Sequence, residues 1–223
     1  MTLKQDTRLS ALIDWMRESA APASGLLIPL SGGSDSALIF WLLNQAFPDK
    51  TVGVHIGTSE HFRCRQWFEE TGTVRYVAPI TEAGADAEVL RWARVQSICV
   101  SEQRWLVGSR NRTEDLLGTY SFASCVATYL PLVNMLKSDV MALCLLAGVP
   151  EEVLTSSRQA DPSCGRPEEM AEIALEQVDQ YLRHMLGYPD ALCGLSEGTI
   201  IYLNSVYERN HFKRLLPKRG PVL

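Results

Sequence analysis

The sequence predicts an α/β fold, a doubly wound parallel sheet with helices on both faces. Short runs rich in aliphatic and β-branched residues, at 26–30, 50–56, 74–78 and 105–107, are typical of buried strands. Segments with helical spacing of apolar residues separate these runs, and strands that alternate with helices pair in parallel. The chain has 223 residues, of which 46% are hydrophobic, so it is long enough to bury one sizeable core. Because no repeat or low-complexity linker divides it, residues 1–223 are expected to form a single domain.

Apolar spacing and end signals locate the predicted helices. Residues 6–20, for example, place Leu9, Leu12 and Met16 on one helical face. The same criteria predict helices from residue 37 to before Pro48, at 59–71, at 85–103, from about Thr113, at 138–146 with Ser138 and Asp139 as caps, from Pro167 through Met185, and at 197–212. Residues 155–166 are expected to form a polar loop. In a sheet of this kind, ligands bind beyond the carboxyl ends of the strands.

Composition excludes several classes of function. A net charge of −5 leaves no broad basic field, so no nucleic acid partner is expected. The apolar runs are too short to cross a bilayer, and the first residues lack the apolar core of a signal peptide. We therefore expect a cytoplasmic protein with no membrane partner. The six cysteines are scattered without a Cys-x-x-Cys pair, which argues against a zinc knuckle, an iron–sulfur site or a redox dithiol.

The turn at residues 31–36, Ser-Gly-Gly-Ser-Asp-Ser, is the centre of the predicted site. It follows the first strand and opens a helix, so the free N–H groups and the positive end of that helix point at the turn. The glycines let a phosphate approach the backbone closely, and the serine hydroxyls add donors. Asp35 adds negative charge, which indicates a Mg²⁺ ion held against the phosphates. The alternative, a helix start with ordinary capping serines, would not need so many glycines and hydroxyls.

A second strand–turn–helix junction follows the strand at 105–107. There, Ser109 can donate to a phosphate, and Glu114 can be a second carboxylate on Mg²⁺. The alternative is a capped helix in which Glu114 interacts with the positive end of the helix dipole. In a parallel sheet both junctions lie at the carboxyl ends of strands, so Asp35 and Glu114 are predicted to meet.

These motifs resemble two nested families. The turn matches the Ser-Gly-Gly-x-Asp-Ser signature of the PP-loop ATP pyrophosphatases, whose fold is adenine nucleotide alpha hydrolase-like. Over residues 25–214 the chain resembles the NAD synthase family, through Gly-Ser-x-Asn-x-x-Glu at 108–114, Pro-Leu-Val-Asn-Met-Leu-Lys at 131–137, Gln-Ala-Asp at 159–161 and the basic stretch at 209–214. The resemblance implies an ATP-dependent amide-forming ligase. Such an enzyme adenylates a carboxylate, deamido-NAD or a related acid, releases pyrophosphate and transfers ammonia to give an amide and AMP.

The resemblance also implies roles for individual residues, with ATP and Mg²⁺ as cofactors. The ATP-binding residues would be Ser31, Gly32, Gly33, Ser34, Asp35, Ser36, Ser109, Lys137 and Gln159, with Asp35 and Glu114 on Mg²⁺. Lys137 would offset charge on the leaving pyrophosphate, and Asp161 would orient ammonia or take up its proton. Arg94, Phe122 and Lys213 would contact the acyl substrate. The family also implies a homodimer, with ammonia either free or delivered by a separate glutaminase.

The resemblance is weakest on the acyl-substrate side. Residues 118–126 lack the Lys and Asp that the family carries after the second Mg²⁺ helix, and Gln159 stands where the family has Ser or Thr. Amidation of a different carboxylic acid is therefore an alternative. A catalytically inactive ATP-binding sensor is another alternative, although two carboxylates at a nucleotide site favour catalysis. Among other PP-loop relatives, thiolating enzymes need clustered cysteines, and tRNA-modifying enzymes need a basic surface.

Overall fold

The computed structural model describes residues 7–82, 85–158, 173–189 and 194–215, and these contain a parallel sheet of order β3-β2-β1-β4. The strands are β1 (Leu26–Pro29), β2 (Thr51–Ile56), β3 (Val74–Val77) and β4 (Trp105–Leu106). In the register, Leu27 pairs with both Val52 and Leu106, so β1 is central. The order places the loops after β1 and β4 side by side at the carboxyl edge. The predicted parallel α/β fold is confirmed.

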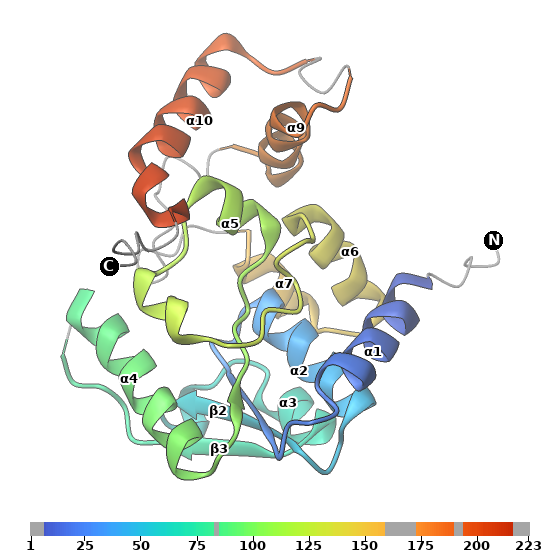
Figure 1. Ribbon diagram of the computed structural model, residues 1–223, viewed down its shortest axis with the longest axis vertical. Helices are drawn as coiled ribbons and strands as arrows, with labels where there is room; N and C mark the ends of the chain where they lie inside the picture. The colour runs from blue at the N-terminus through green and yellow to red at the C-terminus, as the bar shows by residue number, and fades with distance from the viewer. Residues whose placement is uncertain (1–6, 83–84, 159–172, 190–193, 216–223) are drawn as a thin grey trace, which may run out of the picture.

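Helices connect and cover the strands (Figure 1). They are α1 (Thr7–Ser19), α2 (Ser34–Ala46), α3 (Arg65–Thr71), α4 (Ala85–Ser101), α5 (Arg112–Leu117), α6 (Lys137–Leu146), α7 (Glu151–Ser156), α9 (Leu175–Met185) and α10 (Glu197–Arg209). Short 3₁₀ turns are η1 (Ser59–His61), η2 (Phe122–Val126) and η4 (His211–Arg214). No helix in the described ranges is both long and apolar enough to cross a lipid bilayer.

Alternation along β1 divides the core into two layers. Leu26 and Ile28 pack with α1, α2 and α6, whereas Leu27 packs with Val95 and Cys99 of α4 on the other face. All three β1 side chains are fully buried, as expected for a central strand covered on both sides. Helix α2 is buried nearly all round, which explains its continuous apolar sequence. The turn at residues 31–36, named the phosphate turn from here on for its predicted role, therefore lies between a buried strand and a buried helix.

A third apolar cluster lies beyond the sheet and consists of α9, α10 and the helix ends they cover. Figure 1 shows α9 and α10 at the end of the molecule opposite β2 and β3, with α5 between. The cluster comprises Leu117, Leu136, Val178, Tyr181, Leu182, Leu203 and Val206. Leu117 ends α5 and Leu136 precedes α6, so this cluster holds both helices that carry predicted site residues.

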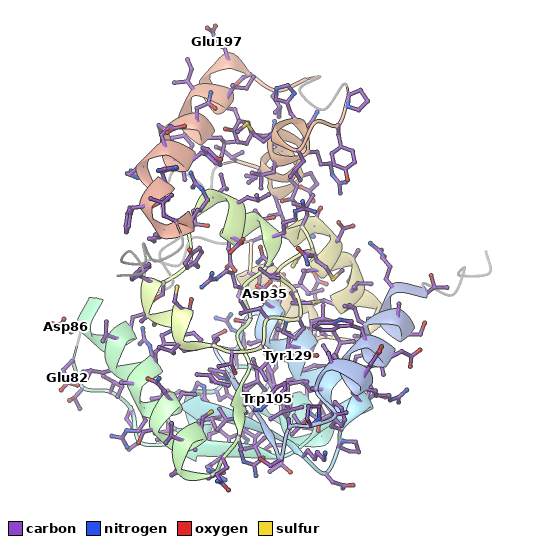
Figure 2. All side chains as sticks on the ribbon, viewed as in Figure 1. Asp35, Glu82, Asp86, Trp105, Tyr129 and Glu197 are labelled. Atoms are coloured by element: carbon purple, nitrogen blue, oxygen red, sulfur yellow. The ribbon has the colours of Figure 1, made fainter. Side chains whose placement is uncertain are left out.

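Aromatic rings pack together at the β4 edge of the sheet. Tyr129 stacks on Trp15 of α1 with ring centroids 5.3 Å apart, and its hydroxyl lies 2.7 Å from the Ser19 hydroxyl. Trp105 of β4 lies close by, with ring centroids 6.2 Å apart, and Figure 2 shows Trp105 and Tyr129 near each other below Asp35. These contacts join α1 to the β4 edge.

Several predicted helix starts were wrong. Helix α2 begins at Ser34 rather than at residue 37, whereas α5 begins at Arg112, close to the predicted start near Thr113. Ser138 and Asp139 do not cap α6, because Leu136 is the N-cap residue and both side chains fall inside the first turn. In the predicted helix at 59–71, only the part from Arg65 is α-helical. The predicted helix from Pro167 through Met185 is helical only from Leu175 in its described part, because Ala174 is the N-cap residue of α9, and its predicted start lies outside the described residues. The loop predicted at 155–166 overlaps the end of α7, which runs to Ser156.

Two glycines with similar backbone angles test how tightly α10 docks on α5. Gly118 (φ +66°) and Gly148 (φ +71°) are both left-handed, but a Cβ at Gly118 would lie 2.6 Å from Asn210 Cβ, whereas nothing lies within 4 Å at Gly148. Gly148→Ala should cost only the backbone strain, about 1–2 kcal/mol. Gly118→Ala should cost about 1–3 kcal/mol more, because overpacking adds to the strain. Denaturant unfolding measures both, and equal losses would contradict close docking.

Candidate active site

Asp35 and Glu114 come together through one buried asparagine. Asn111, 1% exposed, is the N-cap residue of α5, and its side-chain oxygen accepts from the Glu114 N–H at 3.0 Å. The Glu114 carboxylate accepts in return from the Asn111 N–H at 3.1 Å, which completes a capping box. The Asn111 amide nitrogen then donates to Asp35 Oδ1 at 2.9 Å. One residue therefore orients both carboxylates, from two different strand–helix junctions.

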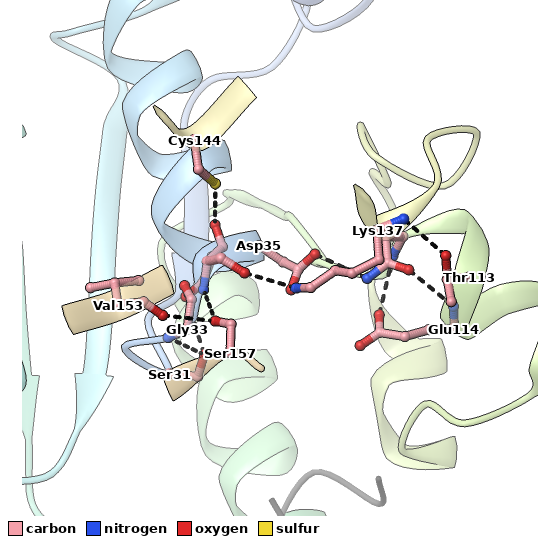
Figure 3. A network of polar contacts seen from close by, with 12 residues as sticks. Ser31, Gly33, Asp35, Thr113, Glu114, Lys137, Cys144, Val153 and Ser157 are labelled. Carbon is pink, nitrogen blue, oxygen red and sulfur yellow. Dashed lines mark hydrogen bonds and ion pairs between the residues drawn. The ribbon is translucent and has the colours of Figure 1, made fainter. Parts of the chain in front are cut away.

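Lys137 supplies the positive charge between them. Its ammonium group donates to Ser34 Oγ at 2.8 Å and forms an ion pair with Asp35, while its side chain is 10% exposed. Figure 3 shows this side chain reaching from α6 to Asp35, with Thr113 and Glu114 on its other side. Burial opposes the charge, but Asp35 and Glu114 outweigh burial and raise the pKa of Lys137 above its ordinary value. Lys137 is therefore a permanently charged group.

Glu114 holds its proton more tightly than an exposed glutamate does. Burial, together with the charge of Asp35, raises the pKa of Glu114 from 4.5 to about 7, against the opposing effect of Lys137. Mg²⁺ prefers oxygen ligands and is typically held by one or two carboxylates plus substrate phosphates. No cluster of three or more His, Cys, Asp or Glu side chains that could hold a metal occurs in the described part of the chain. The pair of Asp35 and Glu114 therefore fits Mg²⁺ that shares its coordination with a nucleotide.

The phosphate turn has one backbone conformation that favours glycine, at Gly32. Gly32 adopts φ +82°, in the left-handed region, and Gly33 is the N-cap residue of α2 without a capping side chain. The hydroxyls of Ser31 and Ser36 lie 3.1 Å apart, and Ser36 donates to the Gly33 carbonyl at 3.0 Å. The Gly33 N–H also donates to Ser31 Oγ at 3.2 Å, so the serine hydroxyls bond to one another and to the backbone of the turn.

Ser157, at the end of α7, already uses one of those N–H groups. The Ser34 N–H donates to Ser157 Oγ at 2.9 Å, and Ser157 Oγ donates to the Val153 carbonyl at the same distance. Behind the turn, the Cys144 thiol lies 3.5 Å from the Ser34 carbonyl, and burial raises its pKa to about 12. Cys144 is therefore a packed thiol and not a nucleophile (Figure 3).

Of the predicted acyl-substrate residues, Lys213 lies near the largely enclosed side chain of Arg110. Arg110 stacks over the Tyr120 ring at 3.5 Å and donates to Asp115 at 3.2 Å, and its Nε has no hydrogen-bond partner among the described residues. Lys213 donates to the Tyr120 carbonyl at 2.9 Å, and burial and Arg110 lower the pKa of Lys213. This side of the site is rich in cations.

The side chain of Phe122 is exposed and does not belong to the core. It is 60% exposed, and its ring lies 6.2 Å from that of Phe212, which is 59% exposed. Two neighbouring exposed aromatic rings near the half-buried cations Arg110 and Lys213 can face an acid that carries both an aromatic ring and negative charge.

Two other predicted residues, Ser109 and Arg94, are not joined to this network by a hydrogen bond or ion pair among the described residues. Ser109 is half-buried shortly beyond β4, and Arg94 is an exposed side chain of α4 without a hydrogen bond or ion pair to any described residue. Gln159 and Asp161 lie outside the described residues.

Three residues of the site were missed in the sequence. Asn111 could have been found, because Asn-x-x-Glu is a capping-box pattern, but placing the helix start near Thr113 hid it. Arg110 carries no local signal, because its partners Tyr120 and Ser124 follow α5 in an irregular segment. Ser157 carries none because it meets the turn 123 residues away in the chain.

Comparison with known proteins gives a consistent result. Residues 83–217 match the family described as NAD synthase. The NH(3)-dependent NAD(+) synthetase of Carboxydothermus hydrogenoformans is 24% identical over 211 residues, which cover 82% of this chain and 87% of that protein. Among solved structures, the NMN synthetase of Francisella tularensis superposes with a TM-score of 0.78 at 20% identity, covering 96% of this chain and 97% of that one. An NH3-dependent NAD synthetase from Campylobacter jejuni gives 0.76 at 16% identity, with 96% and 97% covered.

The raised pKa of Glu114 predicts a pH dependence of stability. Between pH 4.5 and 7 the unfolded chain has lost the Glu114 proton and the folded protein keeps it. The unfolding free energy of the wild type should therefore fall relative to Glu114→Gln as pH rises through this window, by on the order of 1–3 kcal/mol. Gln accepts the same N–H bond, so the capping box survives. Denaturant unfolding without nucleotide or divalent cation measures the difference, and a pH-independent difference would contradict the burial of Glu114 beside Asp35.

Proposed function

The chain belongs to the NAD synthase family, and we propose that it is an ammonia-dependent amide ligase that activates deamido-NAD with ATP. The observation that carries this proposal is the convergence of Asp35, Glu114 and Lys137 at the phosphate turn. A carboxylate is a poor electrophile, so it must be activated before ammonia can displace an oxygen from it. ATP supplies this activation through an acyl-adenylate.

The proposed binding of ATP rests on the phosphate turn and on the charged side chains of Asp35, Glu114 and Lys137. The turn binds phosphates through its backbone N–H groups and the positive end of α2, and the Ser34 N–H becomes available if Ser157 gives way. When bound, Mg²⁺ on Asp35 and Glu114 would offset the charge that gathers on the phosphates. Lys137, charged and buried, is placed to stabilise pyrophosphate as it leaves. Such charge stabilisation acts in the transition state, where it raises the rate.

The acid side follows from Arg110, Lys213 and Tyr120. The substrate carboxylate oxygen attacks the α-phosphorus, pyrophosphate departs, and an acyl-adenylate forms. Ammonia then attacks the acyl carbon and loses a proton as AMP departs. Two cations stacked on or near one tyrosine ring favour an anionic, aromatic acid at this position. Asp161 is proposed to orient the ammonia or take up its proton.

A second acid belongs in the same proposal because residues 118–126 depart from the family pattern. Arg110 covers the Tyr120 ring at 3.5 Å, which leaves less room there for a ring of the substrate. One structural neighbour is named an NMN synthetase, so the smaller acid with a single nucleotide is the natural competitor. Homodimer formation and a separate glutaminase as ammonia source remain proposals drawn from the family.

The function is tested by ATP–pyrophosphate exchange with a panel of acids. Without ammonia, the enzyme should exchange labelled pyrophosphate into ATP only when deamido-NAD is supplied. Ammonium should then give equal amounts of AMP and amide, measured by mass spectrometry. Exchange only with nicotinate mononucleotide or an unrelated acid would establish the alternative ligase. No exchange with any acid, together with tight ATP binding, would establish the sensor.

Asp35→Asn should abolish turnover in a folded protein. The amide keeps the size of the side chain but loses the charge that faces Lys137 and the proposed Mg²⁺. We expect turnover to fall at least about 100-fold, since losing even a group that supports a metal ligand costs about 10–100-fold. The Mg²⁺ concentration that gives half-maximal rate should also rise.

The matched control is Asp14→Asn, which removes a surface carboxylate paired with Arg17 on α1. It should leave turnover and Mg²⁺ dependence unchanged. Circular dichroism and thermal unfolding verify that both variants are folded. An Asp35→Asn enzyme with wild-type turnover would remove Asp35 from the metal site.

A further inference from the structure

A carboxylate on α9 is buried at the junction of α5 and α6. Asp179 is 2% exposed, although α9 lies outside the sheet layers. Its Oδ1 accepts from the Thr113 hydroxyl at 2.5 Å, and its Oδ2 accepts from the Ser138 N–H at 2.7 Å. The first turn of α6 has no capping side chain of its own, so Asp179 supplies both a hydrogen bond and favourable negative charge there.

Thr113 connects Asp179 by hydrogen bonds to the backbone of Lys137, and it is the neighbour of Glu114 in the chain. The Thr113 hydroxyl, which donates to Asp179, accepts from the Lys137 N–H at 2.9 Å. Thr113 also directly precedes Glu114 in α5. The backbone of Lys137 is therefore held by the residue next to the proposed metal ligand, and Asp179 fixes the orientation of that residue's hydroxyl.

We propose that Asp179 is a positioning residue, which sets the place of Lys137 relative to Glu114 through the Thr113 hydroxyl and the Ser138 N–H. The inference rests on the proposed function, because it assigns Lys137 to the leaving pyrophosphate. Asp179 touches neither Lys137 Nζ nor the phosphate turn, so it acts only through other residues. A shift of Lys137 away from the leaving group costs transition-state stabilisation more than it costs ATP binding.

A neighbouring carboxylate provides a matched control. Asp139 also lies in the first turn of α6 and also reaches α9, where it accepts from Arg183 at 3.4 Å. It accepts from Arg8 of α1 at 2.8 Å, and its side chain is 33% exposed. Asp139 thus links the same two helices on the surface, without any bond to Thr113 or Lys137. A general loosening of α9 would follow from losing either carboxylate, whereas positioning of Lys137 depends on Asp179 alone.

The test compares Asp179→Asn, Thr113→Val, Thr113→Ser and Asp139→Asn in acid-dependent ATP–pyrophosphate exchange by the full chain. Asn has one side-chain acceptor, so it cannot serve both donors, and Val removes the hydroxyl while keeping the shape of threonine. Asp179→Asn and Thr113→Val should each lower kcat at least about 10-fold, with KM for ATP changed less than about 3-fold.

The remaining variants separate positioning from stability. Thr113→Ser keeps the hydroxyl and should restore kcat to within about 3-fold of the wild type, and Asp139→Asn should match the wild type. The double variant Asp179→Asn/Thr113→Val should be no slower than the worse single variant, because both changes break one chain of bonds. Wild-type kcat in Thr113→Val, additive losses, or an equal loss in Asp139→Asn would overturn the proposal. If Asp179→Asn does not fold, Thr113→Val decides by the same criteria.

A readout without turnover keeps this test separate from the proposed function. Hydrogen exchange of the amides at the start of α6 should accelerate in Asp179→Asn and Thr113→Val but not in Asp139→Asn. If none of the acids in the panel supports pyrophosphate exchange by the wild type, the proposed function fails. Hydrogen exchange of the backbone amides still decides whether Asp179 holds α6. Unchanged amide exchange in both variants would overturn the link itself.

Discussion

The candidate active site is organised around one buried lysine, which lies between two carboxylates. Lys137 is surrounded by Asp35, Glu114 and Ser34, and its charge is sustained because the carboxylates outweigh the cost of burial. A buried ion pair of this kind adds little to stability on balance, since desolvation offsets most of the attraction. Its value lies in preorganisation: the charges are fixed before a polyphosphate arrives, so little reorganisation is needed as the reaction proceeds.

The local structures that hold these charges serve two purposes at once. Asn111 caps α5 in the ordinary way, and its spare amide N–H orients Asp35 on the neighbouring junction. Gly33 brings no capping side chain to the start of α2, so the Ser34 N–H is left to Ser157, a residue far away in the chain. In the proposed function, a phosphate takes the place of Ser157 at this N–H.

The sheet and the turn could be predicted from the sequence, because each depends on local patterns. The convergence of the two junctions then followed from the parallel order of the strands. Strands β1 to β4 followed from short aliphatic runs, and Ser31 to Ser36 from the density of glycine and hydroxyl groups. Helix starts were less accurate, because α2 and α6 lack the polar caps that mark a helix end in sequence. Asp139 looked like a cap by position, whereas the group that actually reaches the start of α6 is Asp179, some forty residues later.

Several of the contacts that could not be predicted involve α9 and the segment around Lys213. Asp179 reads as a polar position on an amphipathic helix, and nothing near it in sequence reveals its burial. Arg110 reads as a solvated surface residue beside a turn, yet its environment is built by Tyr120, Cys125 and the segment around Lys213. Such contacts depend on how α9 and α10 pack on α5, which only the tertiary structure defines.

The reciprocal bonds between Tyr120 and Lys213, hydroxyl to carbonyl at 2.5 Å and ammonium to carbonyl at 2.9 Å, have a consequence for biosynthesis. The phosphate turn and its strand leave the ribosome early, but the residues that complete the acid side and steady α6 are translated more than a hundred residues later. Under the proposed function, a nascent chain therefore carries its nucleotide-binding turn well before the acid side of the site is assembled. Formation of the reactive mixed anhydride then has to wait until the segment around Lys213 has packed against Tyr120.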